Sequence, residues 1–304
     1  MNHQGHGLAL DHPIFRTPNP VSFPTTTATR GRHHTGYTSP LYPEGMGETY
    51  ELVDFEISEP AGPNPTIVSH EGFFTDVPGF ESLCEGESAK MLGSLSLCRQ
   101  GRYFYWGYSI DPDRLTDPAE DTLVNVIHYM APRRGESTTP YVCKPRRSLW
   151  VYLALNRESG YLRGIEEHFL GSVKEASRSD YEPTPDGLAH WLDENLPYVF
   201  SGKDESHHGK RYDTIFEVDF DAQRLGTPNA ERQSLERWLA MAADSDPGAA
   251  EVALRLLRRY VHPDIAPAEW DDPQGWYAAV KDRIVFVESA GFYWLEDPRP
   301  VGSR

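Results

Sequence analysis

The spacing of apolar residues changes along the chain, from a strand-like period in the first half to a helical period in the second. Three segments between residues 66 and 109 read TIVSHEGF, KMLGSLSL and RYFYWGYS. Each is rich in β-branched or aromatic residues and is bounded by Gly or Pro, which is typical of β-strands. The pattern therefore predicts a sheet in this part of the chain.

A helix is predicted directly after the last of these strands. Asp117 can cap the free amides at a helix start, and Pro118 suits the first helical position. Apolar residues then recur at the i, i+3, i+4 and i+7 spacing of one helix face, and they are Leu123, Val126, Ile127 and Met130. We expect these side chains to form a buried stripe.

Beyond residue 146 the pattern is mainly helical. Helices are predicted over PTPDGLAHWLDENL, DFDAQRLG and DPQGWYAAVKDR, and IVFVESAGFYWLED predicts two strands joined as a β-hairpin. Apolar residues at helical spacing supply a candidate core for this module: Leu188, Trp191, Leu192, Leu235, Trp238, Leu239, Val252, Leu256 and Tyr260.

Two stretches lack a periodic pattern. Residues 1–65 are rich in Pro, Gly, Thr and His, which favours extended loops that wrap another part of the protein. The segment MAPRRGESTTPYVCKP, residues 130–145, combines Pro, Gly and charge, as linkers between domains do. We therefore predict a loop-rich sheet domain over residues 1–135 and a helical module over residues 146–304.

Two segments carry a resemblance to a known family. HPIFRTPNPV, residues 12–21, and GRYFYWGYSIDPDRLTDPAEDTLVNVIHYM, residues 101–130, resemble the closing half of glutamine-amidotransferase-like domains related to trehalose-utilisation (ThuA-like) proteins. Residues 148–298 are similar to helical extensions behind such domains in bacterial proteins. The resemblance implies an α/β fold, with an incomplete amidotransferase-like (flavodoxin-like) sheet domain followed by a mainly helical module that ends in a β-hairpin.

The resemblance also implies that the first strand and helix units of such a domain are missing. Parallel strands without neighbours expose their edges and faces. We expect the N-terminal segment, a second copy of the chain in a homo-oligomer, or a companion protein to cover the sheet.

Charge and composition narrow the classes of partner. The 304 residues carry 29 Lys and Arg against 46 Asp and Glu, a formal net charge of −17. This charge disfavours nucleic acid. The sequence shows no apolar run of membrane-spanning length and no export signal in MNHQGHGLAL. No membrane insertion is expected, and a cytoplasmic location is the default expectation.

An amidotransferase nucleophile is a Cys on a tight turn between a strand and a helix, flanked by small residues. Cys84 in SLCEG has the right spacing, but the sequence has no His-x-Glu pair downstream. We therefore interpret Cys84 as a structural thiol.

Two further sets of residues are candidates for binding. His3, His6 and His12 lie close together in sequence and could hold a metal ion, although their spacing matches no known metal motif. Trp106 and Tyr108 lie nearest the carboxyl end of their strand, where open α/β sheets bind ligands. They could stack against a carbohydrate, or they could belong to a sheet buried on both faces.

These observations favour a non-catalytic ligand-binding or assembly component, because the nucleophile of the family and its partners are not found. No cofactor is expected. The alternative is a hydrolase that holds a metal ion through the N-terminal histidines.

Overall fold

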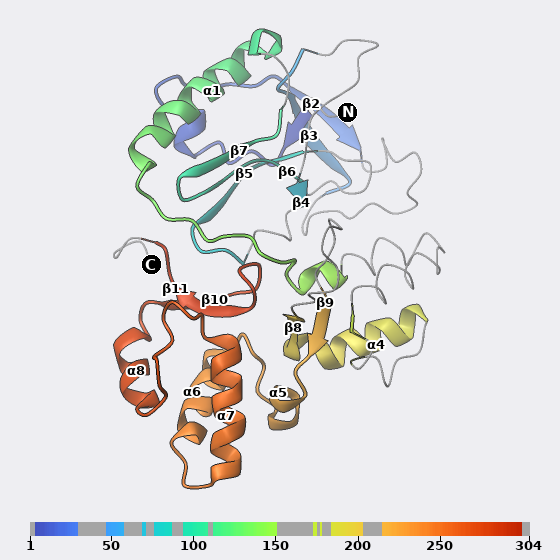
Figure 1. Ribbon diagram of the computed structural model, residues 1–304. Coiled ribbons are helices and arrows are strands. Elements are labelled where there is room, and N and C mark those ends of the chain that lie inside the picture. Colours follow the sequence, from blue (N-terminus) through green and yellow to red (C-terminus); the bar gives the residue numbers. More distant parts are fainter. Residues whose placement is uncertain are drawn as a thin grey trace. The chain divides into compact units, whose positions relative to one another are not determined.

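The structure is a computed structural model that describes residues 4–29, 47–57, 69–70, 76–86, 94–108, 112–150, 173–174, 177, 184–202 and 215–299 (Figure 1). The chain forms two compact units. The N-terminal unit comprises Met1–Thr139 and Pro298–Arg304, and the C-terminal unit comprises Pro140–Asp297. The division falls inside the aperiodic segment of residues 130–145.

The N-terminal unit is built on a seven-stranded sheet. Its strands run in the order β2-β3-β1-β5-β6-β4, and β7 also pairs with β6. The strands are β1 (Gln4–His6), β2 (Thr25–Thr29), β3 (Thr49–Asp54), β4 (Ser69–His70), β5 (Phe80–Gly86), β6 (Ser94–Gln100) and β7 (Tyr103–Trp106).

The α/β class is confirmed, but the flavodoxin-like arrangement is not. A flavodoxin-like sheet has parallel strands joined by crossover helices, whereas every pairing between the described strands is antiparallel. Strands β6 and β7 are joined directly by a tight turn in which Gly101 has a φ of +52°. A connection this short can join only antiparallel neighbours.

The interpretation of residues 1–65 as mostly extended loops did not include three strands that this region supplies, β1, β2 and β3. In β2 only Ala28 is buried and the four Thr residues are exposed. The β-branched Thr side chains favour strand geometry without producing an apolar alternation. Periodicity therefore gave no signal for this strand.

The predicted helix is present as α1 (Asp117–Met130), between the short 3₁₀ helices η3 (Pro112–Arg114) and η4 (Ala131–Arg133). Its N-cap is Thr116 rather than Asp117. The predicted stripe is also rotated, because Ile127 is 63% exposed and the buried residues are Ala119, Thr122, Asn125 and Val126.

One face of the sheet carries the core of this unit. Helix α1 and the 3₁₀ helix η1 (Pro13–Phe15) pack there against Val53, Phe55 and Leu97. A sheet six strands wide measures roughly 25 Å across, whereas a helix covers about 10 Å. The helix therefore leaves part of this face to be covered by loop residues.

The C-terminal unit contains the predicted helices and the predicted C-terminal hairpin. The described elements are α4 (Pro185–Asn195), η7 (Leu196–Tyr198), β8 (Val199–Gly202), β9 (Ile215–Val218), α5 (Phe220–Leu225), α6 (Arg232–Ala242), α7 (Pro247–Tyr260), α8 (Pro273–Val280), β10 (Ile284–Val287) and β11 (Tyr293–Glu296). The antiparallel pair β8–β9 was not predicted.

Helix ends in this unit follow the sequence signals. Asp246 and Asp272 cap α7 and α8, each followed by Pro in the first turn. Gly226 ends α5 in the left-handed conformation, with a φ of +62°. The core between α6 and α7 includes Trp238 stacked on Tyr260, with ring centroids 5.4 Å apart.

Within the described residues, every helix is too short or too polar to cross a lipid bilayer.

Candidate functional site

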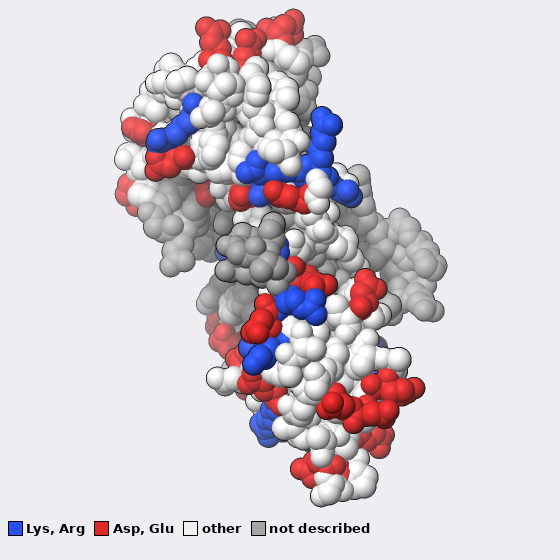
Figure 2. Space-filling view, turned by 90° about the vertical axis from the view of Figure 1, so that its left-hand side faces the viewer, with Lys and Arg blue, Asp and Glu red and all other residues white. Residues whose placement is uncertain are grey.

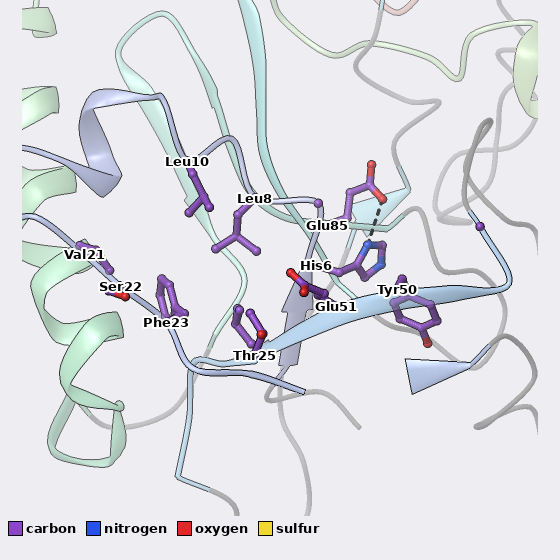
Figure 3. A pocket seen from close by; sticks show the side chains of 13 residues that line it. His6, Leu8, Leu10, Val21, Ser22, Phe23, Thr25, Tyr50, Glu51 and Glu85 are labelled. Atoms are coloured by element: carbon purple, nitrogen blue, oxygen red, sulfur yellow. Dashed lines mark ion pairs between the residues drawn. The ribbon is translucent and has the colours of Figure 1, made fainter. Parts of the chain in front are cut away.

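A pocket of about 630 Å³ opens on the N-terminal unit, between strands β1, β2 and β3 and the segment that leads from β1 to β2 (Figure 3). Its lining has two chemically different ends. Apolar side chains lie at one end, and an imidazole with a carboxylate partner lies at the other.

His6 and Glu85 form the polar end of the pocket. His6 is 3% exposed, and its Nδ1 lies 3.4 Å from Glu85 Oε2 (Figure 3). The rings of His6 and Tyr50 make an edge-to-face contact, with centroids 5.4 Å apart. Glu51, an exposed residue of β3, completes the ionisable lining.

Strand pairing explains why these residues meet. His6 in β1 stands opposite Glu85 in β5, so the two side chains are cross-strand neighbours. The pairing of β5 with β6 is irregular between Ser82 and Glu85. Such bulges redirect side chains, and here Leu83 and Cys84 are both buried while Glu85 remains at the pocket.

Leu8, Leu10, Val21 and Phe23 form the apolar end (Figure 3). The ring of Phe23 contacts the core through Phe55, with centroids 4.8 Å apart. This end of the pocket is therefore continuous with the hydrophobic core.

Asn125 of α1 fastens the chain segment that leads into the apolar wall. Its side chain is fully buried and donates to the carbonyl oxygens of Ile14 and Asn19 at 3.0 and 2.7 Å. It also accepts from the Asn19 amide at 2.8 Å. Three bonds from one side chain fix the path of residues 14–19, which precede Val21 and Phe23.

The charged residues that line the pocket are acidic. Glu51 and Glu85 accompany His6, and the lining within the described residues includes no Lys or Arg. On the face shown in Figure 2, several groups of acidic side chains stand apart from basic ones, whereas the basic side chains lie mostly beside acidic ones. The local charge of the pocket therefore has the same sign as the net charge of the chain.

Trp106 and Tyr108 lie in the core rather than in this pocket. Tyr108 is 2% exposed, stacks on Phe55 at 4.3 Å and donates its hydroxyl to Ser96 at 3.0 Å. Trp106 is partly buried and meets the same Phe55 ring edge-on. The rule that ligands bind at carboxyl ends of strands applies to parallel sheets, so it does not carry over to this antiparallel one.

The N-terminal histidines have separate partners. His6 contacts Glu85, whereas His12 Nε2 lies 3.6 Å from Glu81 Oε2, and His3 lies outside the described residues. His12 Nδ1 accepts from the Ile14 amide, so both ring nitrogens of His12 are engaged. Where the structure describes the chain, no three His, Cys, Asp or Glu side chains lie close enough to hold a metal ion.

Glu81 and Arg99 form a second polar cluster, next to a smaller cavity of about 260 Å³. Arg99 donates to both Glu81 oxygens at 2.7 and 2.9 Å, and to Glu136 at 2.6 Å. Burial alone would raise the pKa of Glu81, but hydrogen bonds from His12, Arg99 and Tyr129 and the charge of Arg99 lower it to about 2. Glu81 and Arg99 bond to each other, and each has a further partner, Tyr129 for Glu81 and Glu136 for Arg99. Because these side chains are already engaged within the protein, we interpret the cluster as structural.

Cys84 lies in the middle of β5 with no exposed surface. Its Sγ approaches the His6 carbonyl oxygen at 3.5 Å, and burial raises the pKa of the thiol to about 12. A Cβ on Gly5 would lie 2.6 Å from this sulfur, so no space for a substrate exists there. An activated thiolate needs a lowered pKa and an accessible sulfur, and Cys84 has neither.

Comparisons with protein-family models, with curated proteins and with solved structures found no significant match. A function can therefore be inferred only from the chemistry of the site itself. Sequence reasoning singled out His6 but missed its partners Glu85 and Tyr50, which reach the pocket through strand pairing.

Proposed function

We propose that the N-terminal unit binds a small organic cation with an apolar body, and that it does so without catalysing a reaction. The observation that carries the proposal is the two-ended lining, with Leu8, Leu10 and Phe23 at one end and the His6–Glu85 pair at the other. A ligand with one apolar and one cationic end matches both.

Electrostatics favours a cation over an anion. The lining carries the carboxylates of Glu51 and Glu85, and it includes no Lys or Arg among the described residues. An anion would meet repulsion in a partly desolvated site, whereas an ammonium group would gain charge-assisted hydrogen bonds. The ring of Tyr50 offers a face for the same cation.

The pocket volume suits a small molecule. Ligand sites typically measure about 300 to 1,000 Å³, and this pocket measures about 630 Å³. Stacking against a carbohydrate was one of two interpretations of Trp106 and Tyr108, and neither of these rings lines the pocket. The proposal also makes no use of the amidotransferase-like resemblance.

A metal-dependent hydrolase remains the alternative. Hydrolysis would need a nucleophile or a metal-bound water beside His6. Ser22 is the hydroxyl residue nearest the apolar end, and Figure 3 places it across the pocket from His6. Assembly with a second copy or a companion protein is a separate proposal, which the mass of the protein in solution tests.

Calorimetric titration with ligands of one shape and three charges tests the binding proposal. We expect 2-phenylethylamine to bind more tightly than 2-phenylethanol, and 3-phenylpropionate to bind least. Glu85→Gln should weaken the amine about tenfold, the effect of one charge-assisted hydrogen bond, with little effect on the alcohol. Phe23→Ala should weaken both.

Glu120→Gln is the matched control, because Glu120 is exposed on α1 and does not line the pocket. This variant should bind all three compounds as the unchanged protein does. Preferential binding of 3-phenylpropionate, or equal amine affinity in Glu85→Gln and the unchanged protein, would rule the proposal out.

A further inference from the structure

A second pocket, of about 340 Å³, lies in the C-terminal unit where the last turn of α7 meets β8 and the start of β11. Its lining differs in chemistry from that of the first pocket. Three arginines of α7 line it, together with aromatic side chains from the two strands. The lining includes Arg255, Arg258, Arg259, Phe200 and Tyr293.

Arg259 is held in place before any ligand arrives. One of its nitrogens, Nη1, donates to Asp219, a carboxylate with 1% of its side chain exposed. Its guanidinium carbon also lies 4.9 Å from the centroid of the Phe200 ring. Asp219 in turn accepts from the Tyr260 hydroxyl at 2.8 Å and from two amides at the start of α5. A guanidinium fixed in this way loses little entropy on binding.

The other two arginines differ in how their charge is balanced. Arg255 donates to Asp221 at 2.9 and 2.7 Å. Arg258 is exposed, and it makes no ion pair or hydrogen bond with the part of the chain that the structure describes. Arg258 therefore brings one uncompensated positive charge to the pocket.

The helix dipole opposes this charge without cancelling it. The carboxyl end of a helix carries the equivalent of about −0.5 charge. The described lining contains the three arginines and no Asp or Glu, because Asp219, Asp221 and Glu251, which pairs with Arg255 at 3.5 Å, all lie outside it. The pocket is thus a locally positive site on a chain with a net charge of −17.

We propose that this second pocket binds a small oxyanion, a phosphate or a carboxylate, carried on an aromatic or similarly flat body. The planar fork of Arg258 matches the oxygen pairs of either group. Tyr293 and Phe200 provide apolar surface beside it. This site and its ligand are independent of the cation pocket in the N-terminal unit.

Titration of the full chain with phenyl phosphate, benzoate and benzyl alcohol tests the proposal, followed by calorimetry or by NMR shifts. We expect the two anions to bind and the alcohol not to bind. The tighter anion identifies the group, phosphate or carboxylate. Arg258→Ala should weaken that anion about tenfold and Arg258→Lys by less, because lysine keeps the charge without the fork.

Arg224→Ala is the matched control, since Arg224 lies in the same unit, does not line the pocket, has 77% of its side chain exposed and pairs with Asp221 only at 4.0 Å. It should leave anion binding unchanged. Unchanged melting of Arg258→Ala verifies its fold, as expected for an exposed residue. Absence of anion binding, or equal weakening by Arg224→Ala and Arg258→Ala, would overturn the site in favour of diffuse charge attraction.

Discussion

The two units differ in how far apart in the sequence their packing partners lie. In the N-terminal sheet, β1 pairs with β3 and with β5, so Gly5 faces both Val53 and Gly86. In the C-terminal unit, Trp238 of α6 stacks on Tyr260 of the next helix. A sheet whose strands come from distant parts of the sequence needs all of those parts to be present. Consecutive helices that pack on each other need only the segment that contains them.

Truncation is the strongest test of this difference. Removing residues 1–60 deletes β1, β2 and β3, and with them one side of the sheet and of its core. We expect the N-terminal unit to unfold and the variant to aggregate through exposed apolar surface. A fragment spanning Pro140–Asp297 should stay soluble and melt cooperatively, because it contains its own core clusters.

Circular dichroism melting and gel filtration report both outcomes. A deletion variant that melts like the full chain would show that the first three strands do not support the sheet. A C-terminal fragment without a cooperative transition would show that the two units depend on each other.

Removing one buried charge partner should have the next largest effect. Arg99→Met leaves Glu81 without its two shortest hydrogen bonds, and because the Glu81 side chain is 31% exposed we expect the cost of losing hydrogen bonds to a charged group, about 1.5–3 kcal/mol of unfolding free energy. Urea denaturation measures the loss. Arg134→Met, at an exposed position nearby, should change stability by less than about 0.5 kcal/mol. Equal effects of the two variants would refute the structural role of the cluster.

The same carboxylate predicts a pH dependence. The pKa of Glu81 falls from 4.5 to about 2 on folding, so the unfolded chain binds more protons between these values. The contribution of Glu81 to stability is therefore complete above pH 4.5 and is lost as the pH falls toward 2. Comparison with Glu81→Gln isolates this contribution, because the unfolding free energy of that variant should fall less steeply as the pH is lowered. Identical slopes for the two proteins would contradict the lowered pKa.

The same contrast explains what the sequence could predict. Helices α4, α6 and α7 bury the apolar faces that their spacing indicated, including Leu188, Trp238 and Leu256. Strand β2 buries only Ala28, and β1 is three residues long, so neither contains enough alternation to be detected. Asn125 is a polar residue, so the apolar spacing gives no sign of its burial, which follows from its bonds to a segment more than 100 residues away.

The candidate site could be predicted only in part, because it also depends on contacts between residues far apart in the sequence. The sequence indicated His6 as one of several neighbouring histidines. The pocket, however, depends on the register between β1 and β5, which places His6 opposite Glu85. The segment FESLCEG does not alternate between polar and apolar residues, because Glu81, Leu83 and Glu85 fall on one face of a regular strand, so periodicity gave no signal there. The local sequence does not show that this strand, β5, pairs with β1.

Substitutions at single glycines give the most local comparison of the two units. Gly101, in the β6–β7 turn, has a φ of +52°, and a Cβ there would collide with the backbone oxygen of Ser137. Gly226, at the end of α5, has a φ of +62° but open space around it. Gly135 has open space and no left-handed backbone.

Alanine at these three positions should therefore give a graded series in the free energy of unfolding. Gly226→Ala should cost about 1–2 kcal/mol, the price of the left-handed conformation alone, and Gly101→Ala should cost more because the backbone must also move. Gly135→Ala should be neutral or stabilise by about 0.4–1 kcal/mol through the unfolded chain. Urea titration of the three variants gives the order. A Gly101→Ala loss no greater than that of Gly226→Ala would mean that the turn relaxes freely, so that the sheet of the N-terminal unit tolerates local change as readily as a helix end does.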